Sequence, residues 1–136
     1  MTFVLDNSVA MRWCFDANHP YADPILEKLE NGLDDALVPV MWLYEASAVI
    51  AQAQNRSILS AEKADEFIDA LLALGITTDP ESPTRIFPDV HRMAITYRLS
   101  SYDASYLELA IRRGLPLATL DDDLAKASRA AGVPLL

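Results

Sequence analysis

Residues 100–124 read SSYDASYLELAIRRGLPLATLDDDL, and this stretch decides the fold class. Ser100, followed three residues later by Asp103, is typical of a helix N-terminus, and Arg112-Arg113-Gly114 is typical of a helix end. Residues 116–120 predict a short buried strand, and the three acids after them predict the start of another helix. A helix, a strand and a helix in direct succession favour a parallel sheet with helices on both faces.

The rest of the chain repeats this alternation of short apolar strands and helices. Further strands are predicted at 2–5, 36–40, 76–78 and 133–136. Further helices are predicted at 8–15, at 22–32 with Asp23 as N-cap and Pro24 at the first helical position, at 42–56, from Ser60 to Gly75, and at 83–99 with Pro88 as a kink or a start. In such sheets, ligands bind beyond the carboxyl ends of the strands.

Composition limits the class of protein. The chain has 136 residues, of which 51% are hydrophobic, so we expect one domain spanning residues 1–136. Cys14 is the only cysteine, which excludes an internal disulfide and suits a reducing compartment. The most apolar stretch, residues 36–51, is interrupted by Pro39 and Glu45. The sequence therefore predicts a soluble cytoplasmic protein without a secretory signal or a membrane partner.

The formal net charge of −9 argues against a general nucleic-acid coat protein. Acidic residues concentrate in the first part of the chain, whereas the last part carries more arginines. These arginines could form a local phosphate-binding edge, or they could simply be solvated residues on helix surfaces. The candidates are Arg85, Arg92, Arg98, Arg112 and Arg113.

Four acids stand where a structural role alone explains them poorly. Asp6 and Asp121 each follow a predicted strand, where a helix cap is the alternative interpretation. Glu45 lies within the apolar stripe of its helix without a Lys or Arg one turn away, so its alternative is a long-range salt bridge. Asp103 shares an inward face with Tyr106, although it also fits a capping box.

Together, the four acids predict a divalent cation at one edge of the sheet. Crowded carboxylates repel one another and take up protons, and a cation removes that cost. Oxygen ligands without a His or Cys cluster favour Mg²⁺, with Mn²⁺ as the alternative, over zinc. His19 and His91 lie far from the acidic stretches and are interpreted as surface or packing residues.

At these positions the sequence resembles the PIN-domain proteins, and more narrowly the VapC toxins of bacterial toxin–antitoxin pairs. The stretches that carry the resemblance are VLDNSV (4–9), WLYEASAVI (42–50) and LSSYDASYLELAIRRGLPLATLDDDLAKASRAAGV (99–133). The resemblance implies a PIN-like three-layer α/β/α sandwich with a central, mainly parallel sheet of four to five strands. The family acids fall on Asp6, Glu45, Asp103 and Asp121.

Three further positions match the family pattern. Asp123 matches an additional acid of some members and joins Asp6, Asp103 and Asp121 as a candidate metal ligand, while Asp122 is interpreted as a surface neighbour. Ser8 and Thr119 match the small hydroxyl positions beside the first and last acids.

The resemblance implies a metal-dependent endoribonuclease that hydrolyses RNA to a 5′-phosphate and a 3′-hydroxyl. Glu45 could bind the metal or orient the attacking water, and the sequence leaves both roles open. The resemblance also implies a homodimer, inhibition by a cognate antitoxin, and no nucleotide cofactor. The alternative is a catalytically silent PIN scaffold that acts as a protein-interaction module. An aspartyl-phosphate phosphatase with Asp6 as nucleophile is disfavoured, because Ser8 stands where a second acid is needed.

Overall fold

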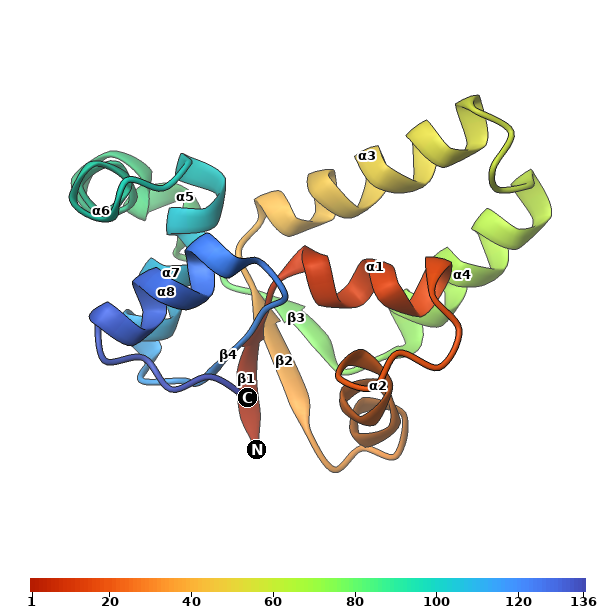
Figure 1. The fold of residues 1–136 in the computed structure, drawn as a ribbon, viewed down its shortest axis with the longest axis horizontal. Helices are drawn as coiled ribbons and strands as arrows, with labels where there is room; N and C mark the ends of the chain where they lie inside the picture. Colours follow the sequence, from red (N-terminus) through yellow and green to blue (C-terminus); the bar gives the residue numbers. More distant parts are fainter.

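The computed structural model describes all 136 residues and is built around a parallel sheet of four strands. The strands are β1 (Thr2–Leu5), β2 (Asp35–Val38), β3 (Ile76–Thr78) and β4 (Leu117–Ala118), in the order β3-β2-β1-β4. All three strand pairings are parallel. In Figure 1 the amino ends of the strands and both chain termini lie at the bottom, and the carboxyl ends point upward.

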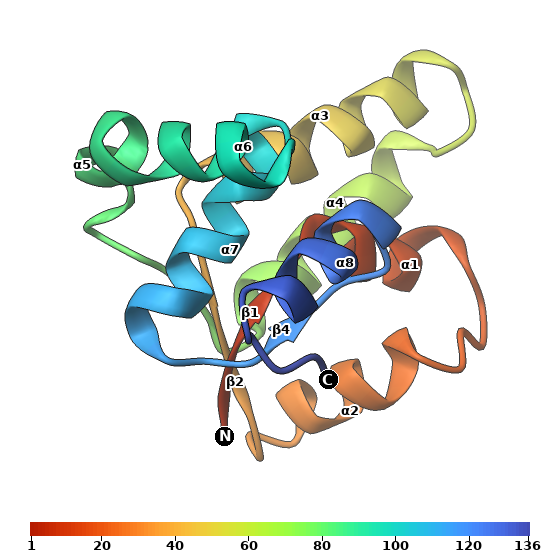
Figure 2. The same cartoon turned by 60° about the vertical axis from the view of Figure 1, so that its left-hand side comes forward.

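Helices cover both faces of the sheet. They are α1 (Asn7–Phe15), α2 (Ala22–Glu30), α3 (Met41–Asn55), α4 (Ala61–Ala73), α5 (Ser82–Arg85), η1 (Ile86–Val90), α6 (His91–Tyr97), α7 (Ser101–Arg113) and α8 (Asp122–Ala130). Helices α1–α4 lie to one side of the strands in Figure 1 and α5–α8 to the other. The predicted three-layer α/β/α sandwich is therefore confirmed, and Figure 2 shows α7 and α8 in front of the sheet after a rotation.

One main core joins the two helical layers through the sheet. Its buried residues include Phe3, Val4 and Leu5 of β1, and Leu107 of α7. Burial of apolar area of this kind stabilises a domain by roughly 25 cal/mol per Å². None of the helices is long and apolar enough to cross a lipid bilayer.

The end of the chain differs from the sequence prediction. Strand β4 has only two residues, and residues 133–136 contribute one isolated bridge, between Leu117 and Leu135, instead of a strand. Four residues with a proline among them offer too few backbone donors for a regular ladder.

Helix α2 includes Ala22 and Asp23 ahead of Pro24, the predicted first helical position, so Asp23 is not its N-cap. The ring of His19 replaces the expected cap, because its Nδ1 accepts hydrogen bonds from the backbone N–H groups of Tyr21 and Ala22 at 3.2 and 3.1 Å. His19 is thus a local structural residue.

The segment predicted as one helix from 83 to 99 is divided into α5, η1 and α6. Pro88 lies within the π-helical turn η1. Proline has no N–H to donate and crowds the preceding turn, which accounts for the widened turn. Pro88 therefore interrupts the predicted helix at a π-helical turn and does not mark its start.

Candidate active site

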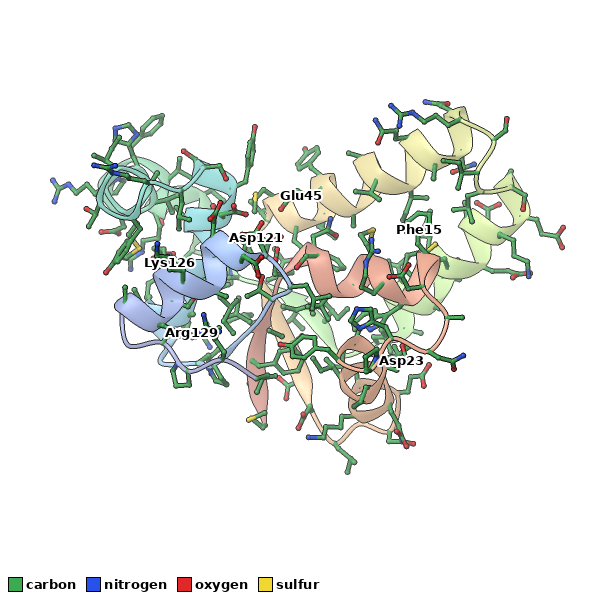
Figure 3. All side chains as sticks on the ribbon, in the orientation of Figure 1. Phe15, Asp23, Glu45, Asp121, Lys126 and Arg129 are labelled. Carbon is green, nitrogen blue, oxygen red and sulfur yellow. The ribbon has the colours of Figure 1, made fainter.

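The four predicted acids occupy element starts at the carboxyl-end side of the sheet. Asp6 lies between β1 and α1, and Asp121 is the N-cap of α8. Asp103 lies in the first turn of α7, and Glu45 lies near the start of α3. Figure 3 shows Glu45 and Asp121 on this side of the molecule, above the strands.

Asp6 is 4% exposed, and two hydroxyl groups hold it. Its Oδ2 accepts hydrogen bonds from Ser8 Oγ at 2.6 Å and from Thr119 Oγ1 at 2.7 Å. The same hydroxyl oxygens accept the backbone N–H groups of Leu120 and Asp121, each at 3.0 Å. Ser8 and Thr119 therefore lie beside Asp6, as predicted, and join the β1–α1 turn to the β4–α8 turn. Asp6 Oδ1 takes part in none of these bonds.

Asp121 and Asp103 combine capping with proximity to the site. Asp121 Oδ1 accepts the N–H of Leu124 at 2.8 Å, and Ser100 Oγ accepts the N–H of Asp103 at 3.1 Å. Asp121 thus caps α8 and Ser100 caps α7, and these two bonds use neither Asp121 Oδ2 nor the carboxylate oxygens of Asp103.

Sequence reasoning did not assign a role to two tyrosines that border the site. The hydroxyl of Tyr106 donates a hydrogen bond to Glu45 Oε1 at 2.7 Å. Burial raises the pKa of Tyr21, and the negative charge of Asp6 raises it further. The position of Tyr106 three residues after Asp103, on one face of a helix, was the available sequence signal. No comparable signal marks Tyr21.

The pKa values show that the four acids act on one another. Burial, together with the charges of Asp121, Asp6 and Glu45, raises the pKa of Asp103 to about 6. Burial also raises the pKa of Asp6, with a contribution from Asp121. The pKa of Glu45 is raised by burial and by Asp6, against the lowering effect of Tyr106. Residues from four elements thus form one electrostatic cluster, termed here the acidic site: Asp6, Glu45, Asp103 and Asp121.

No basic side chain neutralises the acidic site. None of its four carboxylates lies within 4.0 Å of a Lys, Arg or His nitrogen. The long-range salt bridge considered for Glu45 is therefore not formed. Next to Asp6, Asn7 also buries its side-chain Oδ1 without a hydrogen-bond partner. Buried oxygens without a donor are rare and often mark an ion or a water.

This donor set fits a hard divalent cation such as Mg²⁺ or Mn²⁺, because it consists of oxygen atoms and negative charge. The structure contains no group of three or more His, Cys, Asp or Glu side chains arranged as a ready-made coordination shell.

Asp123 is not brought into the acidic site. It lines a shallow hollow between α6 and α8 together with Arg98 and Lys126, and none of the acidic-site pKa shifts includes a contribution from it. Asp122 is exposed in the first turn of α8.

The interpretation of Arg112 as a free phosphate-binding residue is wrong. Its guanidinium binds Asp79 at 2.6 Å, Glu108 at 2.7 Å and Glu81 at 3.0 Å, and only 14% of its side chain is exposed. The buried carboxylates of Asp79 and Glu108 bind this guanidinium. Asp79 is 33 residues away in sequence, and Glu108 lies one helical turn earlier on α7.

Of the other four arginines, two form ion pairs and two do not. Arg85 pairs with Glu81 and Asp89, and Arg113 lies 3.8 Å from Asp79. Arg92 and Arg98 are exposed and form no ion pair within 4.0 Å, so they stay candidates for contact with phosphate.

These features define a class: an α/β protein whose parallel sheet carries unpaired, partly buried carboxylates at the carboxyl ends of its strands. A family model described as "PIN domain" matches residues 3–130, and the chain belongs to the PIN domain family. PIN domains are generally nucleases.

Three solved structures are similar to this chain in fold. PAE2754 from Pyrobaculum aerophilum is 21% identical, with a TM-score of 0.69 over 93% of this chain and 79% of that one. VapBC2 from Rickettsia felis, bound to a DNA fragment from their promoter, is 14% identical, with a TM-score of 0.70 over 100% and 98%. FitAcB from Neisseria gonorrhoeae is 18% identical, with a TM-score of 0.66 over 100% and 96%. No curated protein sequence matches the chain.

Proposed function

We propose that this protein is a Mg²⁺- or Mn²⁺-dependent endoribonuclease and the toxin of a type II, VapBC-like toxin–antitoxin pair. Membership of the PIN family supports a nuclease. The resemblance of its motifs to the VapC toxins and its likeness in fold to VapBC2 support the narrower assignment.

A single observation carries the proposal: the acidic site is negatively charged, partly buried and free of any basic partner. The same protein neutralises its other buried acids, Asp79 and Glu108, with Arg112. Four acids are left unpaired, and the pKa values of three of them are raised. A positive charge from outside the chain would therefore stabilise this site. A silent PIN scaffold has no need to keep that arrangement.

The residues divide the chemistry among them. Asp6, Asp103 and Asp121 would hold the cation, and the Ser8 and Thr119 hydroxyls keep Asp6 in one orientation. When bound, the cation supplies a water of lowered pKa and positive charge beside the scissile phosphate. Glu45 would orient the attacking water. Hydrolysis then adds water across the phosphodiester and leaves a 5′-phosphate and a 3′-hydroxyl.

The net charge of −9 suggests that RNA binding depends on metal, since an acidic site without a cation repels phosphate. Arg92 and Arg98 would provide the exposed positive charge near α6. An arginine of the cognate antitoxin could pair with the acidic site and block it.

The proposal includes a homodimer, as the resemblance to VapC implies. Large apolar side chains that could support such an interface are exposed near the start of α3 and on η1: Leu43, Tyr44, Ile86 and Phe87. Light scattering of the purified protein tests this part, and a monomer at micromolar concentration contradicts it.

The decisive experiment maps RNA 5′-ends after induced expression of the native chain, Asp6→Asn and Asp122→Asn. Asp6→Asn should lose cleavage and growth arrest while staying folded. Asp122→Asn removes an equal charge from an exposed neighbouring position and should keep both. Undiminished cleavage by folded Asp6→Asn contradicts the assignment, and harmless expression of the folded native chain with no new 5′-ends favours the interaction module.

A further inference from the structure

A buried phenol reaches into the acidic site from the core. Tyr106 is 0% exposed and belongs to the main hydrophobic core, yet its hydroxyl lies 2.7 Å from Glu45 Oε1. The two residues are 61 positions apart in sequence and join α7 to α3. Buried tyrosines in cores normally have a hydrogen-bond partner, but here the partner is a carboxylate of the acidic site.

Tyr106 provides the single hydrogen bond that the side chain of Glu45 makes within the protein. Asp6, by contrast, is held by two hydroxyls. A glutamate has three rotatable side-chain bonds, so an unrestrained and half-exposed carboxylate samples several positions. The bond from Tyr106 occupies Oε1 and leaves Oε2 without a protein donor.

The phenol suits this task better than a cation does. Burial, and then the charges of Asp6 and Glu45, raise the pKa of Tyr106, so the hydroxyl keeps its proton. It therefore donates a hydrogen bond without adding charge. A Lys or Arg at this place would orient Glu45 as well, but it would also neutralise the acidic site and compete with a divalent ion.

Tyr106 also links Glu45 to two other acids of the site. It lies one helical turn after Asp103 on α7, and its hydroxyl oxygen lies beside the backbone of Asn7, the residue after Asp6. We propose that Tyr106 is a positioning residue: its buried hydroxyl fixes the carboxylate of Glu45 relative to Asp6 and Asp103. The effect on cleavage rests on the proposed nuclease activity, whereas the effect on metal binding can be measured without cleavage.

The test compares Tyr106→Phe with Tyr102→Phe. Both remove one hydroxyl from α7, but Tyr102 is 64% exposed and forms no hydrogen bond through its side chain. Tyr106→Phe removes the single hydrogen bond that holds the Glu45 side chain, so it should lower kcat by roughly 10- to 100-fold with little change in KM. Tyr102→Phe should match the native chain. Equal kcat values for the two variants overturn the proposal.

A double-mutant cycle with Glu45→Gln separates positioning from a general effect on the core. If Tyr106 acts through Glu45, the double variant should be no slower than Glu45→Gln alone. Additive losses show that Tyr106 acts by another route and overturn the proposal. Mn²⁺ affinity, measured by calorimetry without RNA, should follow the same non-additive pattern. This second readout tests the proposal even where the native chain cleaves no RNA.

An NMR measurement covers the case in which Tyr106→Phe does not fold. In protein labelled with ¹³C at the tyrosine Cζ, the Tyr106 resonance should shift on Glu45→Gln, and again when Mg²⁺ is added to the native chain. The Tyr102 resonance should stay in place. An unchanged Tyr106 resonance in the folded Glu45→Gln variant means that the hydrogen bond is not formed, which overturns the proposal.

Discussion

Replacement of Arg112 by Met should strongly destabilise the protein. Met keeps much of the length of the side chain but removes the charge that three carboxylates share. The side chains of Asp79 and Glu108 are 0% and 4% exposed, so both carboxylates stay buried; Glu108 loses its counter-charge, and Asp79 keeps only Arg113, 3.8 Å away. Breaking a buried ion pair from one side costs about 3–5 kcal/mol. For a chain of 136 residues, this corresponds to a fall in Tm of roughly 10–20 °C.

The pH dependence identifies the cause. Burial raises the pKa of Asp79, but hydrogen bonds from Arg112 and Ser82 outweigh it, and the net pKa lies below its ordinary value. A lowered folded-state pKa gives stability that is present above the unfolded pKa and is lost as pH falls through the folded one. In Arg112→Met the same carboxyl should instead have a raised pKa. The difference in stability between the two proteins should therefore be largest near pH 7 and shrink toward pH 4.

The assay is urea unfolding, followed by tryptophan fluorescence at pH 7 and pH 4.5, with Arg92→Met as the control. Arg92 is exposed and forms no ion pair, so its replacement should change the free energy of unfolding by less than about 0.5 kcal/mol. A free energy of unfolding for Arg112→Met within about 1 kcal/mol of the native value at pH 7 would refute the reasoning. A loss of stability that does not depend on pH would refute it as well.

Three further expectations concern the acidic site. Asp103, Asp6 and Glu45 have folded-state pKa values above their ordinary ones, so the folded protein binds more protons, and the metal-free Tm should fall as pH rises from 4 to 7. Asp103→Asn should flatten this profile. Millimolar Mg²⁺ or Mn²⁺ should raise Tm at pH 7, by about 2.7 kcal/mol in unfolding free energy at a hundredfold excess over Kd, and no shift in a thermal scan would contradict a cation at this site. Thr119→Val removes a hydroxyl that holds Asp6 and accepts a backbone N–H, so it should cost about 1–3 kcal/mol in chemical unfolding, whereas Thr96→Val on exposed α6 should cost far less.

The elements that the sequence predicted well are those whose signals are local. Ser60 and Ser100 cap their helices through the expected backbone N–H groups, and Gly114 ends α7 with a φ of 62°. Such caps depend on residues within one turn, so a short window of sequence contains the whole interaction. The cap of α2 was misplaced because a histidine ring, which is not a usual capping group, accepts its first N–H groups.

The contacts that the sequence did not predict join distant segments. Arg112 and Asp79 are 33 residues apart, and Tyr106 and Glu45 are 61 apart. Periodicity shows which face of a helix is buried but not what lies opposite, so Arg112 at the end of α7 looked like a solvated or phosphate-binding residue. The positions of the four acids were predictable, because the carboxyl ends of parallel strands meet at one edge of a sheet.

The protein contains buried acids in two different settings, and the contrast between them decides how the acidic site is interpreted. Asp79 and Glu108 are neutralised permanently by Arg112, a residue of the same chain. The acidic site has no such residue; neutral hydroxyls of Ser8, Thr119 and Tyr106 orient two of its carboxylates and leave their charge intact. Neutral donors fix geometry without satisfying charge. A site built in this way favours a positive partner that arrives from solution and can leave again, which is the behaviour that a catalytic cation or an inhibitory arginine requires.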